Sequence, residues 1–357
     1  MSVLPTDVLL PNERERQQIF YWLQRISSYT AWSRILGYYH AWAKVTEKSV
    51  QAASERGWSQ KSSVSESDLV MILKGLAHCE EGVRRLRQGD KRVFKYDANG
   101  EFVMARSALS VWSTKQYRVY TRDTSIDTDH TPYWPEFEYA FEQLIGAWRE
   151  CATEVIEPER LDAPSPTIYG VWLQEWLPKM TFPRMLPEVP DPAKHTLIAT
   201  GKITPCSGIW EPVEVPKPKG FHLFGNAPPP EGPLPMVGCM AYLHGGSPAP
   251  RAKQETETES LRADVTWRLL WRDDRYEDGT VPEEESTYVF LKPDPSLAAP
   301  EPEELRGGMR VWSDTPCPYP GVWQCLDKPL GPQTVAFGVP MPRVQGERVL
   351  WRLMKAV

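Results

Sequence analysis

The sequence predicts an α+β fold by segregation, with an N-terminal helical bundle domain followed by two related small β-barrel modules of the SH3-like kind. The first observation is the distribution of proline, since only eight of the 35 prolines precede residue 181. Proline interrupts helix interiors, so residues 1–181 should be helical and the rest should form strands and ordered loops. The second observation is a phrase that occurs twice, once ending in Gly208-Ile209-Trp210 and once in Gly321-Val322-Trp323.

Apolar residues at helical spacing predict the helices of the first domain. Asn12 is a candidate N-cap, and Pro135 and Pro166 suit first-turn positions, where a missing N–H costs nothing. A β-hairpin is expected over residues 92–104, because Asn99-Gly100 lies between alternating segments. The expected helices cover about residues 13–26, 29–57, 65–89, 107–119, 135–151 and 166–177.

The repeated phrases suggest that one β-module is used twice, with insertions in the first copy. Thr204-Pro205-Cys206 is matched with Thr315-Pro316-Cys317, Phe224-Gly225 with Phe337-Gly338, Trp210 with Trp323, and Trp267 with Trp351. Aromatic side chains dominate core burial, so these tryptophans are expected to be core anchors.

Composition and turn residues also set the expected boundaries. Expected strands cover 208–215, 221–225, 236–243, 264–272 and 288–292, with insertions at 226–235 and 245–262. The predicted domains are a helical domain (1–181), a proline-rich linker (182–196), a first β-module (197–292), a Pro/Glu-rich linker (293–307) and a second β-module (308–357).

Charge and cysteine content restrict the class of protein. The formal net charge of −6 argues against nucleic-acid binding, and no segment resembles an export signal or a membrane span, so a cytoplasmic location is expected. A zinc site would need ligands from Cys206, Cys239, Cys317 or Cys325 with His222 or His244. Close ligand pairs are missing from this set, so no metal or cofactor is expected.

A search for catalytic motifs favours a binding protein. The sequence has no phosphate-binding loop, dinucleotide fingerprint, zinc-protease motif or nucleophile elbow, although an enzyme with an unrecognised site stays an alternative. An acidic segment supplies the candidate partner-binding residues: Asp273, Asp274, Tyr276, Glu277, Asp278, Glu283, Glu284 and Glu285. The alternatives are a solvated hairpin end, or a loop whose arginines and carboxylates pair internally.

Several phrases carry a family resemblance. They include residues 22–32, Leu76 to Val83, Gly89 to Lys95, Pro187 to Pro192, Ser207-Gly208-Ile209-Trp210-Glu211-Pro212 and Trp267 to Tyr276. Because these phrases occur together and in this order, the chain resembles a proteobacterial immunity-protein family. Members of that family act against polymorphic toxins, which are often delivered by type VI secretion. The resemblance implies a non-enzymatic antitoxin that binds and blocks a cognate toxin effector domain. A peptide-binding scaffold or adaptor using the β-modules stays an alternative, and the oligomeric state stays open.

Overall fold

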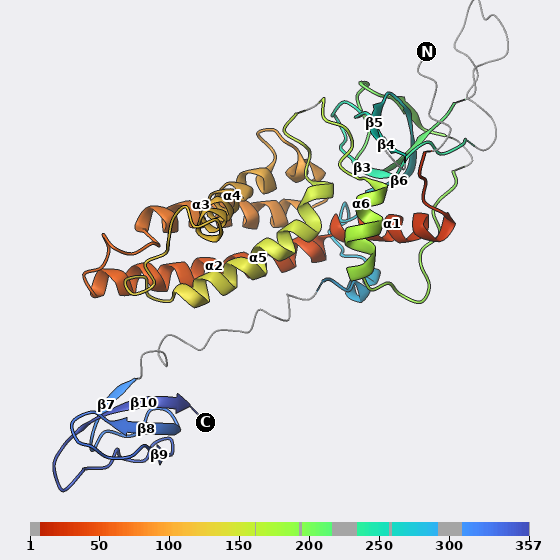
Figure 1. The fold of residues 1–357 in the computed structure, drawn as a ribbon. Coiled ribbons are helices and arrows are strands. Elements are labelled where there is room, and N and C mark those ends of the chain that lie inside the picture. The colour runs from red at the N-terminus through yellow and green to blue at the C-terminus, as the bar shows by residue number, and fades with distance from the viewer. Residues whose placement is uncertain are drawn as a thin grey trace, which may run out of the picture. The chain divides into compact units, whose positions relative to one another are not determined.

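The computed structural model describes residues 8–160, 162–192, 195–215, 234–256, 259–291 and 309–356. Helices occupy the N-terminal half and antiparallel sheets the C-terminal half, so the predicted α+β organisation is confirmed (Figure 1). The chain divides into two compact units. The first consists of Met1–Ala43, Ser67–Ser125 and Phe141–Asp294, and the second of Lys44–Glu66, Ile126–Ala140 and Pro295–Val357.

The first helix begins where the sequence predicts. Asn12 caps α1 (Glu13–Ile26), and its side chain accepts from the backbone N–H of Glu15 at 3.0 Å while the Glu15 carboxylate accepts from the Asn12 N–H at 2.8 Å. This reciprocal capping box satisfies two N–H groups that the helix itself cannot pair. The expected break at Ser27 and Ser28 is also confirmed, because α2 (Tyr29–Glu55) starts directly after it.

Aromatic rings fill the core of the bundle. Trp32 of α2 stacks on Phe102 of α4 (Glu101–Tyr120) at 3.9 Å and meets Trp148 of α5 (Trp134–Val155) edge-on at 5.4 Å. The hydroxyl of Tyr39 donates to the Ala105 carbonyl at 3.0 Å, which is one of the contacts joining α2 to α4. The remaining long helix, α3 (Glu66–Leu86), was expected from about residue 65.

The β-hairpin predicted over residues 92–104 is wrong. Lys91–Phe94 form the 3₁₀ helix η1, and α4 already begins at Glu101 rather than near residue 107. Asn99-Gly100 makes the turn before α4, in which the Asp97 carboxylate accepts from the Asn99 N–H at 2.7 Å. Phe102, Ala105, Leu109 and Trp112 are buried at helical spacing, and this core face outweighs the local turn signal.

The regular helix predicted over residues 166–177 is replaced by short irregular pieces. They are α6 (Tyr169–Val171), the π-helical turn η2 (Trp172–Trp176) and the 3₁₀ turn η3 (Leu177–Lys179). Two N–H groups at the start of this stretch bind the β-module instead of a helix. The Ser165 N–H donates to the Arg251 carbonyl at 2.8 Å, and the Gly170 N–H donates to the Glu255 carboxylate at 2.6 Å.

The first module contains a four-stranded antiparallel sheet with the order β1-β6-β2-β3. Its strands are β1 (Leu197–Ala199), β2 (Gly208–Val213), β3 (Ala241–Leu243) and β6 (Thr266–Arg272). Strands β4 (Ala252–Glu255) and β5 (Ser260–Ala263) form a separate hairpin, where the sequence suggested only an insertion. The predicted strand at 221–225 lies outside the described residues.

The second module repeats this topology. Its strands β7 (Arg310–Trp312), β8 (Gly321–Cys325), β9 (Gln333–Val335) and β10 (Leu350–Ala356) have the order β7-β10-β8-β9. No pairing among the described strands closes either sheet, so the SH3-like barrel stays a prediction.

The strand register confirms that the two tryptophan pairs are equivalent. Trp210 lies opposite Leu269, two residues after Trp267, and Trp323 lies opposite Leu353, two residues after Trp351. All four tryptophan side chains are fully buried, as expected for core anchors. In each sheet, the tryptophan of the last strand in chain order also donates its indole N–H to a proline carbonyl at 2.8 Å, Trp267 to Pro250 and Trp351 to Pro342.

Two of the shorter sequence matches are out of register. Ala249 exchanges backbone hydrogen bonds of 2.8 Å with Gly201 and Lys202, as Met341 does at 2.9 Å with Asp314 and Thr315. This pairing makes Thr204, not Cys206, the counterpart of Cys317. Gly338 donates its N–H to Cys317 as Gly246 does to Thr204, both at 2.8 Å, so the counterpart of Phe337-Gly338 is Gly245-Gly246. The Phe224-Gly225 pair lies outside the described residues.

Candidate functional site: an anchored acidic segment and a proline-walled pocket

The acidic segment continues from β6 along the surface of the first compact unit, and we call residues 273–291 the acidic strap. It contains a turn at 275–278 and the 3₁₀ helix η4 (Glu283–Thr287). The structure divides the eight predicted contact residues into two sets. Asp273, Tyr276 and Glu285 are buried, whereas Asp274, Glu277, Asp278, Glu283 and Glu284 are exposed.

Asp273 is the centre of a buried ion-pair network. Its carboxylate accepts from Nε and Nη2 of Arg275, each at 2.8 Å, and from the Tyr242 hydroxyl at 2.9 Å, while Nζ of Lys91 lies 3.1 Å away. Burial alone would raise the pKa of Asp273, but Arg275 and Lys91 hold it below its usual range. Burial lowers the pKa of Lys91 to about 8 despite the attraction of Asp273. The network joins η1, β3 and the strap, so Asp273 is part of the domain's interior.

Tyr276 and Glu285 attach the strap to the start of α2. The Tyr276 hydroxyl donates to Glu285 and accepts from the Tyr29 N–H at 2.7 Å. The other Glu285 oxygen accepts from the N–H and the hydroxyl of Thr30 at 3.1 and 2.8 Å. A carboxylate bound to the first N–H groups of a helix is favoured by the helix dipole. Tyr276 adopts a φ of +71°, which is costly for a residue with a side chain, and these bonds hold it there.

The end of the strap replaces the strand predicted over residues 288–292. Within the described residues 288–291 no strand forms, because side chains of the bundle bind the backbone. Arg25 donates to the Val289 carbonyl, Arg34 donates to the Leu291 carbonyl at 2.8 Å, and Glu150 accepts from the Leu291 N–H at 3.1 Å. Both guanidinium groups also pair with Glu150, at 3.1 and 2.8 Å.

These contacts leave the exposed carboxylates on an ordered backbone. Among them, Glu277 lies 3.7 Å from the exposed Arg272, and Asp278 accepts from Thr280. Gly89, after the end of α3, lets the strap approach closely. It has a φ of +83°, and a Cβ there would lie 3.2 Å from the Glu277 backbone. The site therefore presents preformed negative charge rather than a loose charged loop.

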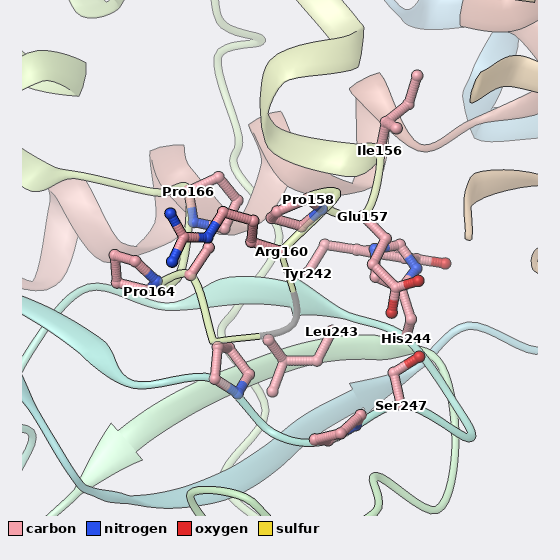
Figure 2. A pocket seen from close by; sticks show the side chains of 13 residues that line it. Ile156, Glu157, Pro158, Arg160, Pro164, Pro166, Tyr242, Leu243, His244 and Ser247 are labelled. Carbon is pink, nitrogen blue, oxygen red and sulfur yellow. The ribbon is translucent and has the colours of Figure 1, made fainter. Parts of the chain in front are cut away.

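A pocket of about 40 Å³ lies between the segment after α5 and the β3 region (Figure 2). Figure 2 shows Glu157 and His244 side by side at one end, with Pro164 and Pro166 toward the other. The lining residues are Ile156, Glu157, Pro158, Arg160, Ala163, Pro164, Pro166, Tyr242, Leu243, His244, Ser247, Pro248 and Pro250.

The pocket brings a serine, a histidine and a glutamate together, which is the residue set of a nucleophilic site. However, Nδ1 of His244 has no hydrogen-bond partner, so neither the Ser247 hydroxyl nor Glu157 binds that nitrogen. A catalytic serine needs a base within hydrogen-bond reach and a third group that orients the base. The pocket therefore holds these three residue types without such a relay.

Within the described ranges, no three histidine, cysteine or acidic side chains are grouped so that they could hold a metal ion. Cys239, Cys317 and Cys325 are buried and Cys206 is half-buried, while His222 lies outside those ranges. Nor does any helix in the described part of the chain have the length and hydrophobicity needed to cross a membrane.

Sequence reasoning missed the residues that hold the strap in place. Lys91, Arg25, Arg34 and Glu150 lie far from residues 273–291 in the chain. The last three sit in helical patterns that look ordinary, and Lys91 lies between a predicted helix and a predicted hairpin. The one available signal was the occurrence of arginine and glutamate on otherwise apolar helix faces, because buried charges are normally paired.

Two family models match the chain. Residues 10–166 match the model described as Immunity protein 71, and residues 190–289 match the one described as Immunity protein 72. Both matched regions belong to immunity protein families. The second match ends within the strap, and the pocket is lined by residues from both matched regions. No curated protein and no solved structure gave a significant match.

Proposed function

We propose that the protein is an antitoxin that binds a cognate bacterial toxin effector domain in the cytoplasm and blocks it by occlusion, without turning over a substrate. The observation that carries this proposal is the pair of immunity-family matches. Delivery of the toxin by type VI secretion belongs to the same proposal. So does the division into a helical domain (1–181) and two β-modules (197–292 and 308–357), which the matched sheet orders support.

The exposed face of the acidic strap is the proposed contact surface. Asp274, Glu277, Asp278, Glu283 and Glu284 lie within eleven consecutive residues, and the side chains of Tyr276 and Glu285 hold this part of the strap to the start of α2. Surface charge of one sign speeds association with a partner of the opposite sign, and preorganisation lowers the entropic cost of binding. The strap therefore suits a toxin domain with a basic cleft. The buried Asp273, Tyr276 and Glu285 would act by holding it in place.

The test is a charge-reversed variant that leaves the buried network intact. Asp274→Lys, Glu277→Lys and Glu284→Lys together change exposed side chains that make no buried contact. The matched control reverses three exposed carboxylates elsewhere, with Glu47→Lys, Glu55→Lys and Glu80→Lys.

Both variants are measured against the cognate toxin for association rate at low and at physiological salt, and for rescue of toxin-expressing cells. The strap variant should associate more slowly and respond less to salt, while the control should behave like the wild type. Equal association rates for the two variants would place the contact surface elsewhere.

The peptide-binding adaptor stays a second candidate because of one observation on the second module. Trp312, Phe337, Val339 and Met354 are large apolar side chains with 48 to 71% of their surface exposed. Exposed apolar side chains mark interaction surfaces when they form a continuous patch. Binding of extended peptides by the full chain, abolished by Phe337→Ser and indifferent to the strap, would favour this function.

A further inference from the structure

The pocket of Figure 2 has apolar, rigid walls and one polar end. Five proline rings (residues 158, 164, 166, 248 and 250) together with Leu243 and Ile156 form most of its lining. A volume of about 40 Å³ accommodates only about two or three water molecules, or the last few atoms of a side chain. The pocket is therefore too small for a nucleotide or a sugar, and its occupant must be a small group on an apolar stem.

The polar end carries an incompletely satisfied pair of side chains. His244 is 93% buried, being only 7% exposed, and its Nδ1 has no hydrogen-bond partner. Beside it, Glu157 is 6% exposed, and one of its oxygens accepts from the Tyr96 N–H at 2.8 Å. Among the described residues, no cationic nitrogen lies within 4.0 Å of the Glu157 carboxylate. Buried charges and polar atoms are normally paired, so this end of the pocket lacks a partner.

The cations around the pocket are directed to other carboxylates. Lys95 lies 3.7 Å from Asp97, and Arg160 lies 3.3 Å from Asp162. Burial lowers the pKa of His244 to about 4, so the imidazole is neutral at physiological pH. A neutral imidazole beside a carboxylate offers acceptors but no positive charge, which disfavours an anionic occupant and favours a cationic donor.

We propose that this pocket receives the cationic end of a lysine or arginine side chain. The Glu157 carboxylate supplies the counter-charge, His244 accepts a hydrogen bond through Nδ1 with its own proton on Nε2, and the proline rings flank the aliphatic stem. That the side chain belongs to the toxin domain rests on the function proposed above, whereas the chemical preference of the pocket does not.

The first test uses the full chain and small probes, without a toxin. The Leu243 side chain lies among the lining side chains (Figure 2), so selective labelling of its two methyl groups allows binding to be followed by NMR. The probes are n-butylammonium and n-propylguanidinium, with n-butanol as the neutral match of the same length. Both cations should cause saturable shifts of these two methyl signals with millimolar affinity, and n-butanol should not.

Glu157→Gln keeps the shape of the side chain and removes its charge, and Glu159→Gln is the control because Glu159 is exposed and two residues away. The shifts should vanish in the first variant and persist in the second. Equal shifts with n-butanol and n-butylammonium in the wild type would show an apolar cavity only, and no shift with any probe would show a site filled by water. Either result overturns the proposal, whether or not Glu157→Gln folds.

The second test identifies the source of the cation. With the cognate toxin, Glu157→Gln should weaken binding at least about tenfold, n-butylammonium should compete, and Glu159→Gln should bind as the wild type does. Cation binding in the first test with unchanged toxin affinity here would refute the toxin as the source and leave the pocket's preference standing. A toxin that is never bound or neutralised would refute the proposed function, and the first test would still decide the pocket.

Discussion

Asp273 and Asp274 are neighbours in the sequence with opposite environments, and this makes them a matched pair for one mutational test. The Asp273 side chain is fully buried, whereas Asp274 is exposed. Asp273→Asn preserves the size of the side chain but removes the counter-charge of Lys91 and the nearer of the two carboxylates that pair with Arg275, which keeps only Glu285 at 3.7 Å. Asp274→Asn removes the same charge from the surface.

The expected magnitudes differ widely. Removing one partner of a buried ion pair costs about 3–5 kcal/mol, because the remaining charge stays buried and uncompensated. Surface substitutions usually change stability by less than about 0.5 kcal/mol. Since domains are stable by about 5–15 kcal/mol, Asp273→Asn should remove a large share of the stability of the first unit.

Urea unfolding followed by far-UV circular dichroism reports mainly on the helices that the network holds. At a slope of about 1–3 kcal/mol per M, the transition midpoint of Asp273→Asn should fall by about 1 M or more, while that of Asp274→Asn should stay unchanged. Lys91→Met added to Asp273→Asn should restore part of the loss by removing one uncompensated cation. Coinciding midpoints for the two single variants would refute the idea that the strap is held by its buried charges.

Three further predictions concern single groups. Burial raises the pKa of Glu154 from 4.5 to about 7, so its contribution to stability is complete below about pH 4.5 and is lost as the pH rises through about 7. As the pH rises from about 4.5 to about 7, the free energy of unfolding of Glu154→Gln, measured by urea titration, should therefore increase relative to that of the wild type by up to about 3 kcal/mol. A difference that does not change with pH would contradict this. Trp351→Phe removes the hydrogen bond to Pro342 and should cost about 1–3 kcal/mol, measured as a lower melting temperature, as should Trp267→Phe with Pro250. Asn12→Ala removes the capping box and should cost about 1 kcal/mol in thermal unfolding, and no loss would show that other contacts hold the start of α1.

Local signals in the sequence predicted helices and strands correctly where the local conformational preference favours the same element as packing in the core. Asn12 begins a helix whose buried face continues to Ile26, and the shortage of proline before residue 181 reflects the long helices found there. The hairpin predicted from Asn99-Gly100 was wrong because a turn at these residues is compatible with either a hairpin or the start of a helix. The helix is favoured because Phe102 packs against Trp32 and the Ala105 carbonyl accepts from Tyr39. No local sequence pattern contains these tertiary contacts.

The acidic segment shows a different limit. Its charges indicate a surface feature, and five of the eight predicted residues are indeed exposed. Asp273 and Glu285 point inward because Arg275, Lys91 and the first turn of α2 meet them. Internal pairing was among the alternatives from the sequence, but Lys91 and Thr30 lie about 180 and 250 residues away in the chain.

Comparison of the two β-modules shows which residues are set by the shared module core and which are set by the neighbours of each module. On the core side of both sheets the same positions hold Trp210 and Trp323, and the sequence repeat predicted this. On the opposite face, Glu211 lies across from Arg268 and pairs with it at 2.7 Å, and the same carboxylate binds Arg16 of α1 at 2.8 Å.

In the second module the equivalent cross-strand pair is Gln324 and Arg352, in which a neutral amide stands where Glu211 does. A carboxylate that is 1% exposed, as Glu211 is, requires compensating charges, and two arginines supply them because a helix covers that face. Gln324 is half-buried and carries no charge that needs such compensation. A sequence repeat therefore identifies the shared core reliably, while the residues that differ between the copies indicate which face of each sheet has been adapted to a neighbour.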